Sequence, residues 1–305
     1  MTLRTLVGYS AAGSDMADRT TFGPVHVDVT DGERALLFWQ QVVGLTLLGR
    51  DGGALHLGVP GRDLLVLHPG ATGPTPRGHS GLYHLALHLP NAGELARAVA
   101  RIAAYRVPQG PTDHIMSLAT YLNDADGIGL ELTLETPHRL GARTRVGDRM
   151  QLVDADGRPS NGREPIDLDF LFDQLPDDDL RRPLPPETTV GHVHLHVADL
   201  AAAEAFYRDV VGFTPRMRSA SSGMADLSAG GSFEHRLALN VWQGEGAPPR
   251  PPGTAGLRHF EIVFRDPAEL DGALARAAAG GHPAEPRADG TLLRDPAGNV
   301  VLLSA

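Results

Sequence analysis

The chain repeats one pattern along its length, and this repetition limits its fold more than any other feature. Residues 29–45 read VTDGERALLFWQQVVGL, and residues 197–213 read VADLAAAEAFYRDVVGF. Each stretch has an Asp, an aromatic pair that begins seven residues later, and then Val-Val-Gly. The Asp can cap a helix that follows a strand, and the glycine suits a left-handed helix end. Each stretch therefore predicts a helix between a strand and a tight turn.

A second pair of stretches extends the repeat. GLYHLALHLPNAGELARAVARI begins at Gly81, and GLRHFEIVFRDPAELDGALARA begins at Gly256. Each predicts a strand with His at its fourth position, a turn and a helix. These units end in a turn and a strand, DADGIGLELTL and DPAGNVVLLSA. Such self-similarity indicates repeated supersecondary units. We predict an α+β chain of four strand–helix–strands units that begin near residues 23, 81, 190 and 256.

The composition between the second and third units changes to that of a linker. It contains DADGRPSNGREP and LPDDDLRRPLPPE, which are rich in Pro, Gly and Asp, although IDLDFLFDQL within it can form one short helix. We therefore predict a flexible extension over 1–20, a first two-unit domain over 21–136, a linker over 137–188 and a second two-unit domain over 189–305.

Composition excludes several classes of function. The chain has no cysteine, which excludes disulfides, zinc ribbons and thiol catalysis. Its formal charge of −10 argues against nucleic acid as a partner, because phosphate binding needs a basic patch. No stretch has the length and apolar character of a signal peptide or of a membrane span. We expect a cytoplasmic protein without a membrane partner.

The stretch GHVHLHV, residues 191–197, has three histidines that alternate with apolar residues. Alternation with a period of two predicts a strand whose three imidazoles, of His192, His194 and His196, project from one face. That face can be an ordinary polar surface or a metal site, and the strand by itself does not distinguish the two.

These units and motifs resemble the vicinal oxygen chelate superfamily, which includes glyoxalase I, bleomycin-resistance proteins and type I extradiol dioxygenases. The resemblance rests on the Asp–aromatic–Val-Gly signature, on the DPAGN turn and on the fourfold repeat. It extends to the two-domain catechol 2,3-dioxygenases of the bacillus type, through GLYHLAL, DHIMSLATYLNDADGIGLEL and GHVHLHVADL. It implies four βαβββ units that form two cup-like, curved mixed sheets.

The resemblance also implies where metal ligands lie. One unit supplies a residue of its first strand, and its partner supplies a residue of its first strand and a carboxylate of its last. Pairing the second unit with the third gives His84, Glu131 and His192, two imidazoles and a carboxylate. This set suits a non-heme Fe(II) oxygenase, although Mn(II) or another divalent ion is open. The alternative for Glu131 is an outward-facing strand residue, which we expect of Glu135.

The first unit paired with the second, the third with the fourth, and the first with the fourth each lack a ligand. The first unit has Pro24 at the first-strand position, and the fourth unit has Leu302 at the carboxylate position. Pairing the first unit with the fourth gives Pro24, His259 and Leu302, of which proline and leucine offer no donor atom. We therefore predict that the second and third units share the metal-binding cup and that the first and fourth form no similar site.

Further residues are assigned by the same resemblance. Tyr121, ten residues before Glu131, is expected to hydrogen-bond the substrate, and His235, on the last strand of the third unit, to act as acid–base group. His114, next to Asp113, is expected to line the pocket or its lid and to assist catalysis. His194 is a candidate substrate contact. Leu237 is expected at the carboxylate position of the third unit, as an apolar pocket wall.

Together these features predict a metal-dependent extradiol dioxygenase that cleaves a catechol-like aromatic diol with O2. A metal-free protein that binds a small molecule or drug is one alternative, and a glyoxalase-type isomerase is another. The apolar residue near position 237 argues against the isomerase, which uses a fourth protein ligand. The sequence does not define the substrate or the metal, and it leaves a homo-oligomer open.

Overall fold

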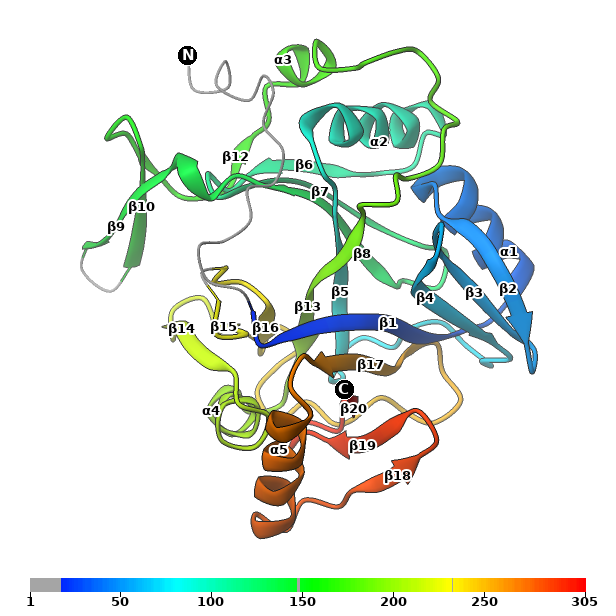
Figure 1. Cartoon of the computed structure of the whole chain (residues 1–305). Helices are drawn as coiled ribbons and strands as arrows, with labels where there is room; N and C mark the ends of the chain where they lie inside the picture. Colours follow the sequence, from blue (N-terminus) through cyan, green and yellow to red (C-terminus); the bar gives the residue numbers. More distant parts are fainter. Residues whose placement is uncertain (1–17, 147–148, 232) are drawn as a thin grey trace.

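Two large mixed sheets make up most of the molecule in the computed structural model, which describes residues 18–146, 149–231 and 233–305 (Figure 1). The predicted extension lies outside the described residues, apart from residues 18–20. In spatial order, the eight-stranded sheet contains β18 (Glu285–Arg287), β19 (Gly290–Arg294), β20 (Val300–Ser304), β17 (Gly256–Phe264), β1 (Thr20–Val29), β4 (Arg62–Pro69), β3 (Ala54–Val59) and β2 (Thr46–Asp51). The nine-stranded sheet contains β12 (Glu164–Pro165), β6 (Gly110–Asp113), β7 (Ser117–Asn123), β8 (Gly129–Glu135), β5 (Gly81–His88), β13 (Thr189–His196), β16 (Leu237–Asn240), β15 (Met224–Ser228) and β14 (Thr214–Ser219).

The order of the strands shows which units pair. β5 of the second unit runs antiparallel to β13 of the third, with His84 opposite His194. β1 of the first unit runs antiparallel to β17 of the fourth, with His26 opposite His259. The predicted pairing of the second unit with the third is therefore confirmed. Residues 21–136 and 189–305 each supply strands to both sheets.

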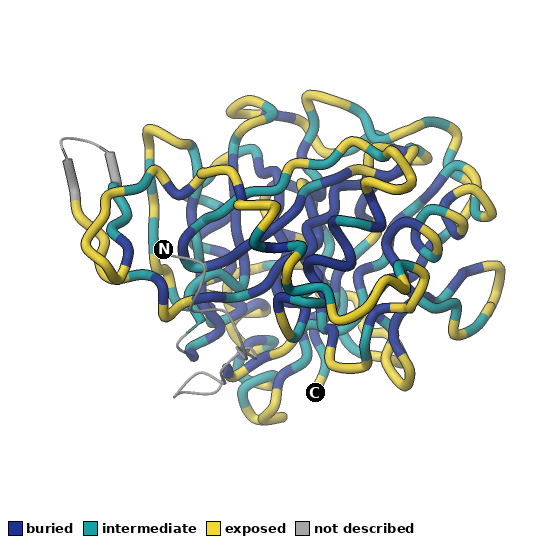
Figure 2. The backbone as a smooth tube through the Cα atoms, turned by 90° about the horizontal axis from the view of Figure 1, so that it is seen from above, coloured by how far each residue is buried: buried dark blue, intermediate teal, exposed yellow. Residues whose placement is uncertain are grey.

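The apolar faces of the two sheets meet in one core. β1 and β17 contact β13 and β5 where the sheets cross in the middle of the molecule (Figure 1). Alternating residues of these strands are fully buried there, among them Val25, Leu85, Val193 and Phe260. Figure 2 shows the buried segments concentrated in this central region. Because side chains of a strand alternate between faces, the histidines of β5 and β13 lie on the side away from this core.

The repeated Asp–aromatic–Gly stretches form matching helices. Helices α1 (Gly32–Leu37) and α4 (Leu200–Ala205) are capped by Asp31 and Asp199, whose carboxylates accept hydrogen bonds from the first helical amides. Each continues without a break into a π-helix, η2 (Phe38–Val43) or η4 (Phe206–Val211). Gly44 and Gly212 end them at φ of 95° and 104°, in the left-handed region that favours glycine. The caps and ends were predicted from the sequence; the widened last turns were not.

The other two units carry longer helices. α2 (Ala92–Ala104) is capped by Asn91, and α5 (Pro267–Ala279) is capped by Asp266. Proline at the first turn of α5 is tolerated because that position needs no amide donor. Among the described residues, no helix is long and apolar enough to cross a membrane.

The predicted linker has more structure than its composition indicates. The short helix expected within IDLDFLFDQL is α3 (Leu168–Phe172), and a 3-10 turn, η3 (Pro137–Arg139), precedes it. Between them, β9 (Leu140–Val146), β10 (Arg149–Asp154) and β11 (Pro159–Ser160) form a small sheet that projects from the molecule (Figure 1). β12 then joins the edge of the nine-stranded sheet beside β6.

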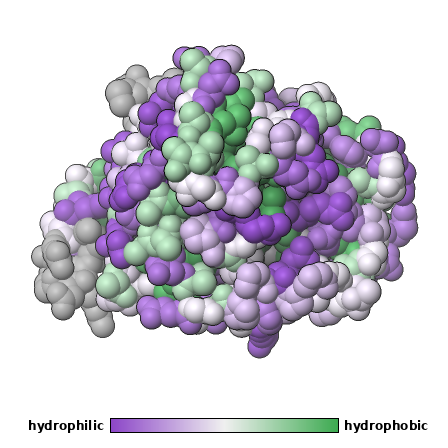
Figure 3. All heavy atoms as spheres, turned by 90° about the horizontal axis from the view of Figure 1, so that it is seen from below, coloured by the Kyte–Doolittle hydropathy of each residue, from purple (hydrophilic) through white to green (hydrophobic). Residues whose placement is uncertain are grey.

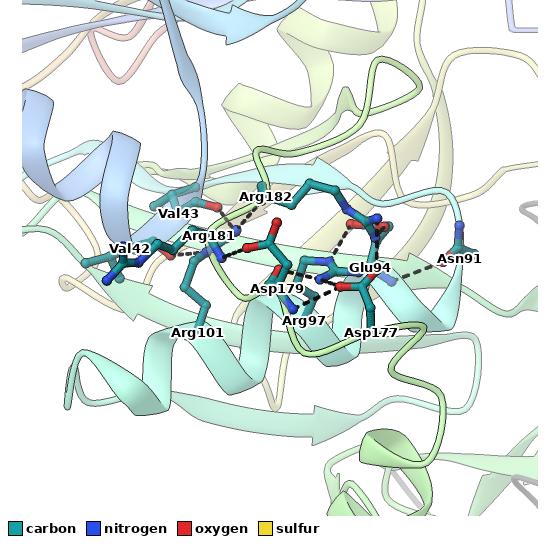
Figure 4. A network of polar contacts seen from close by, with 10 residues as sticks. All are labelled: Val42, Val43, Asn91, Glu94, Arg97, Arg101, Asp177, Asp179, Arg181 and Arg182. Atoms are coloured by element: carbon teal, nitrogen blue, oxygen red, sulfur yellow. Dashed lines mark hydrogen bonds and ion pairs between the residues drawn. The ribbon is translucent and has the colours of Figure 1, made fainter.

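The end of this segment is held down by two buried arginines of α2 (Figure 4). Arg97 donates to Asp177 at 2.7 Å. Arg101 donates to the carbonyls of Val42, Val43 and Arg182, which joins α2 to the end of η2 and to the linker.

The face of the molecule drawn in Figure 3 is largely hydrophilic, with apolar side chains visible between the polar ones.

Candidate metal centre

Three adjacent strands bring His84, Glu131 and His192 together. β5 is parallel to β8 and antiparallel to β13, so the three side chains rise from the same face of neighbouring strands. Glu131 Oε2 lies 3.0 Å from Nε2 of His84 and 3.0 Å from Nε2 of His192. The two Nε2 atoms are 3.2 Å apart, and all three residues are buried. The predicted set therefore forms one compact group of donor atoms.

The charges in this group favour a bound cation. Although burial opposes ionisation, His192 and His84 hold the pKa of Glu131 well below its usual range, so the carboxylate is charged. Burial lowers the pKa of His192 to about 3, so its imidazole is neutral. A buried charge is costly without a partner. Two imidazole nitrogens 3.2 Å apart cannot both be acceptors toward each other, whereas a metal ion would use both lone pairs.

The spacing of these atoms fits a metal ion. Ligand atoms at about 2.1 Å from an ion, on neighbouring octahedral positions, are roughly 3 Å from each other. Two imidazoles and one carboxylate on one face form the arrangement of non-heme Fe(II) oxygenases. His88 Nε2 lies 3.4 Å from Nδ1 of His192, whereas Nδ1 of His84 is buried and has no hydrogen-bond partner among the described residues.

A second carboxylate lies close to the group. Glu135 approaches His88, with 3.3 Å between Oε1 and Nε2, and it lines the same cavity as Glu131. Burial and the charge of Glu131 raise the pKa of Glu135 to about 8. The expectation that Glu135 faces outward is wrong. Every second residue of a strand lies on the same face of the sheet, so Glu135 shares the face of Glu131.

A cavity of about 480 Å³ opens above the three residues. Its apolar lining comes from the two units that share the nine-stranded sheet and from the linker, and consists of Met116, Leu152, Met217, Met224 and Trp242. Its floor is polar, with the imidazoles of His84, His192 and His194 exposed to it. The cavity is large enough for one small aromatic molecule.

Tyr121 and His114 form a hydrogen-bonded pair at the cavity wall. His114 Nδ1 donates to the Gly162 carbonyl at 2.5 Å, which leaves Nε2 as an acceptor. The Tyr121 hydroxyl lies 2.8 Å from that Nε2 and donates to it. Burial and the charge of Glu131 raise the pKa of Tyr121 well above its usual range, and burial lowers that of His114. The loop that holds Gly162 belongs to the linker, which therefore helps to build the site.

His235 lies over His192, with 4.4 Å between the ring centroids. Its Nδ1 is 2.8 Å from Asp226 Oδ1. Burial alone would lower the pKa of His235, but Asp226, Glu131 and Glu135 raise it to about 9. The strand position expected for His235 is corrected: the residue precedes β16, in the loop that leads into it. From there its ring reaches the cavity.

The other two histidines of β13 are fixed by one asparagine. Asn240 Nδ2 donates to His194 Nε2 at 2.8 Å, and His196 Nδ1 donates to Asn240 Oδ1 at 2.7 Å. His194 lines the cavity, as expected of a substrate contact, and Tyr83 packs against both rings. Asn240 was not predicted, because its only signal in the sequence is its place at the end of a strand parallel to β13.

The position assigned to Leu237 is corrected. β16 pairs with β13 so that His194 lies opposite Ala238, as Ala86 lies opposite Glu131 in the second unit. Ala238 is therefore the counterpart of Glu131. Leu237 belongs to the hydrophobic core and does not line the cavity. The fourth ligand position is therefore still apolar, but the residue there is Ala238, one place further along the strand than Leu237.

The comparisons with known proteins agree with this geometry. The family model "Glyoxalase/Bleomycin resistance protein/Dioxygenase superfamily" matches residues 21–132 and 189–303. The chain belongs to this superfamily. It is 32% identical to the catechol-2,3-dioxygenase of Bacillus subtilis (strain 168) over 280 residues, which is 91% of this chain and 94% of that protein.

Solved structures show the same fold at low sequence identity. A provisionally assigned dioxygenase of Bacillus subtilis subsp. subtilis str. 168 matches with a TM-score of 0.64 at 13% identity, covering 94% of this chain and 86% of that one. Glyoxalase I from Zea mays matches with a TM-score of 0.57 at 16% identity, covering 94% and 92%. The superfamily fold, with its curved mixed sheets, is therefore confirmed.

Proposed function

We propose that this protein is a metal-dependent extradiol dioxygenase, which opens the ring of a catechol-like diol next to its two hydroxyl groups and consumes O2. The observation that carries the proposal is the convergence of two imidazole nitrogens and one carboxylate oxygen within 3.2 Å at the floor of a cavity with apolar walls. The likeness to a catechol-2,3-dioxygenase over 91% of the chain supports it.

In this proposal His84, Glu131 and His192 hold Fe(II), with Mn(II) or another divalent ion as the alternative. When bound, the ion would hold the diol and dioxygen side by side and pass electrons between them. Three protein ligands leave positions for both reactants. Ala238, where a fourth protein ligand would stand, keeps this space open.

The chain's own residues would move protons at two places. Tyr121 donates to His114, whose other nitrogen is held by the Gly162 carbonyl, so a diol hydroxyl beside the phenol can release its proton into this pair. His235 is protonated at neutral pH and held by Asp226 above His192. It can therefore donate a proton to oxygen as the O–O bond breaks and take it back afterwards.

The cavity walls would position the aromatic ring. Met217, Met224 and Trp242 offer apolar and aromatic surface opposite the polar floor. His194 cannot turn freely, because Asn240 donates to its Nε2. Its ring therefore presents a fixed edge to the substrate.

The test is anaerobic purification, loading with Fe(II) or Mn(II), and measurement of oxygen uptake and of the yellow ring-opened product on a panel of substituted catechols. We expect uptake to match product formation one to one and to require the metal. His192→Ala should retain less metal and lose at least a hundredfold in turnover. Full metal occupancy without uptake on any catechol would contradict the proposal.

The same measurements separate the alternatives. A metal-free binding protein would bind aromatic ligands equally well in the wild type and in Glu131→Gln. A glyoxalase-type isomerase would act on a hemithioacetal without oxygen uptake. The apolar residue at the fourth ligand position, Ala238, disfavours that activity.

A further inference from the structure

The eight-stranded sheet has a second group of donor side chains, which the proposed function does not use. His26 of β1, with His259 and Glu261 of β17, forms the group that we name the β1/β17 cluster, and His68 of β4 adjoins it. β4, β1 and β17 are neighbours in the sheet. Because the apolar faces of the two sheets meet in the core, this cluster and the candidate metal centre lie on opposite sides of the molecule's central layers.

The donor atoms of the cluster converge. Nε2 of His26 lies 3.2 Å from Glu261 Oε1. The rings of His26 and His259 stack with 4.0 Å between centroids. One donor atom from each of His26, His259 and Glu261 lies within 4.8 Å of the other two. The three residues are partly buried, with 14% and 17% of the side chains of His26 and Glu261 exposed, so an ion can reach them from solvent.

His68 orients the central imidazole. Nδ1 of His26 lies 3.0 Å from Nε2 of His68. A metal-binding histidine commonly donates its second ring nitrogen to a neighbouring acceptor, which fixes the tautomer and aims the other nitrogen at the ion. If His26 donates to His68, its Nε2 lone pair points at the Glu261 carboxylate. A cation between these two acceptors would satisfy both, whereas in the other tautomer His26 donates to Glu261 directly.

The backbone of β1 leaves room for the carboxylate. A Cβ at Gly23 would lie 2.4 Å from Glu261 Oε2 and 2.9 Å from Glu261 Cβ, so only glycine allows Glu261 to fold over this strand. Asp28 pairs with both Arg250 and Arg258, at 2.8 and 2.7 Å, and so offsets one of the two positive charges near the cluster.

The cluster reproduces the donor set of the first site from shifted positions. Its first-strand position in the first unit is Pro24, and the position opposite Glu261 on β20 is Leu302, which is buried. The missing donors come instead from His26, two residues beyond Pro24, and from Glu261, two residues beyond His259. A shift of two residues keeps a side chain on the same face of a strand. The prediction that the first and fourth units form no similar site considered only the unshifted positions.

We propose that His26, His259 and Glu261 form a second metal site, which takes a divalent transition-metal ion that prefers imidazole ligands, such as Zn²⁺ or Co²⁺. His68 positions His26. The bound ion joins β1 to β17, and so joins the first and second halves of the chain at the centre of the eight-stranded sheet. It has no part in the ring-cleavage reaction.

The experiment counts bound ions in metal-free protein that is refilled with Zn²⁺ or Co²⁺, dialysed and assayed by elemental analysis. We expect two ions per wild-type chain and one per His192→Ala chain. His192→Ala/His259→Ala should retain none, and His192→Ala/Glu261→Gln should bind at least tenfold more weakly. The visible spectrum of the Co²⁺ form of His192→Ala reports directly on the second site. If His192→Ala folds poorly, His84→Ala replaces it as the background.

His56→Ala is the matched control, because His56 lies on β3 of the same sheet and pairs with a carboxylate, Asp63, at 2.6 Å without a second histidine in that pair. It should leave two ions bound. The proposal is overturned if His192→Ala retains no ion, or if adding His259→Ala changes neither the stoichiometry nor the Co²⁺ spectrum; the cluster would then be a hydrogen-bonded chain without metal. Neither result depends on whether the protein cleaves catechols.

Discussion

His235 is the ionisable side chain on which the proposed proton transfer depends most. It touches His192 and is held by Asp226 at 2.8 Å. In the proposed mechanism His235 transfers a proton during ring cleavage and does not bind the substrate ring. His235→Ala should therefore lower kcat by about a hundredfold or more and change KM by less than about threefold. Asp226→Asn should have the same kind of effect, but smaller, because the ring remains present and only its orientation and charge are altered.

Steady-state kinetics on the metal-loaded variants would check this prediction. The control is His79→Ala, which removes an exposed histidine that hydrogen-bonds the Arg77 carbonyl and lies outside the cavity. Unchanged turnover in His235→Ala would remove the residue from the mechanism. A rise in KM with unchanged kcat would instead make it a binding residue.

At this scale the sequence predicted the group of His84, Glu131 and His192, which the structure brings together, but not its neighbours. His84, Glu131 and His192 could be found because each stands at a fixed distance from a recognisable turn or helix cap. Asp226 and Asn240 could not, because the pairing of β15 with β16, and of β16 with β13, brings them to the histidines, and no motif in the sequence marks these contacts. The position predicted for the fourth ligand, Leu237, was wrong by one residue, and in a strand a shift of one residue moves a side chain to the opposite face.

One turn recurs three times among the elements, and it positions the strand that carries Glu131. Asp124 accepts hydrogen bonds from the amides of Asp126 and Ile128, at 2.9 and 2.8 Å. Asp154 and Asp295 accept the corresponding amides in their own turns. Each carboxylate thus closes a tight turn. The turn at Asp124 leads directly into β8.

Asp124 should make stability depend on pH. Burial raises the pKa of Asp124 to about 6, above its ordinary 3.8, so the folded protein binds this proton more tightly than the unfolded chain. Its contribution to stability is therefore complete below about pH 4 and is lost as the pH rises through 6, by up to about 3 kcal/mol. Asp124→Asn keeps the acceptor oxygen and removes the charge.

Denaturant unfolding of wild type and Asp124→Asn between pH 4 and 7 would test this. The difference in the free energy of unfolding should change in favour of the variant as the pH rises. Asp271→Asn, at an exposed position of α5, should follow the wild type. Parallel curves for wild type and Asp124→Asn would contradict the prediction.

The linker shows what composition alone could not predict. Pro, Gly and Asp mark turns, and the turns are present, but they connect the short strands β9–β12 rather than a structureless chain. β12 pairs with β6, which lies far earlier in the chain, whereas the short strands β9, β10 and β11 pair with one another in a sheet of their own. Their placement matters, because Leu152, Asn161 and Arg163 line the cavity.

Arg101 connects this segment to the domain beneath it, and its loss should be costly. It is 2% exposed and donates to three backbone carbonyls, of Val42, Val43 and Arg182. Arg101→Leu leaves these acceptors without their donor in a buried place, so we expect a loss of about 3 kcal/mol in the free energy of unfolding. Arg181→Leu, at an exposed position of the same segment, should change it by less than about 0.5 kcal/mol. Equal effects of the two substitutions in urea unfolding would contradict this role.

The two halves of the chain are interleaved at the scale of the whole molecule. The sequence predicted this from the ligand positions, because the second and third units together supply two imidazoles and a carboxylate, whereas the first with the second, and the third with the fourth, do not. It could not predict how the two sheets pack, which depends on many apolar contacts. Residues from both halves, such as Leu85 and Val193, or Val25 and Phe260, share one continuous core.

Interleaving predicts that neither half folds alone. The chain can be cut between Pro186 and Glu187, which are both exposed and lie between α3 and β13. Fragment 1–186 then lacks β13 and β17, so β5 and β1 each lose a partner strand and the apolar faces beneath them meet water. We expect each purified fragment to lack a near-UV circular dichroism signal and a cooperative unfolding transition, and the mixture to recover both together with metal binding. The uncut chain with a protease site inserted at the same place should keep the native signals after cleavage. Cooperative unfolding of fragment 1–186 by itself would show that the halves are independent domains and that their shared sheets form only afterwards.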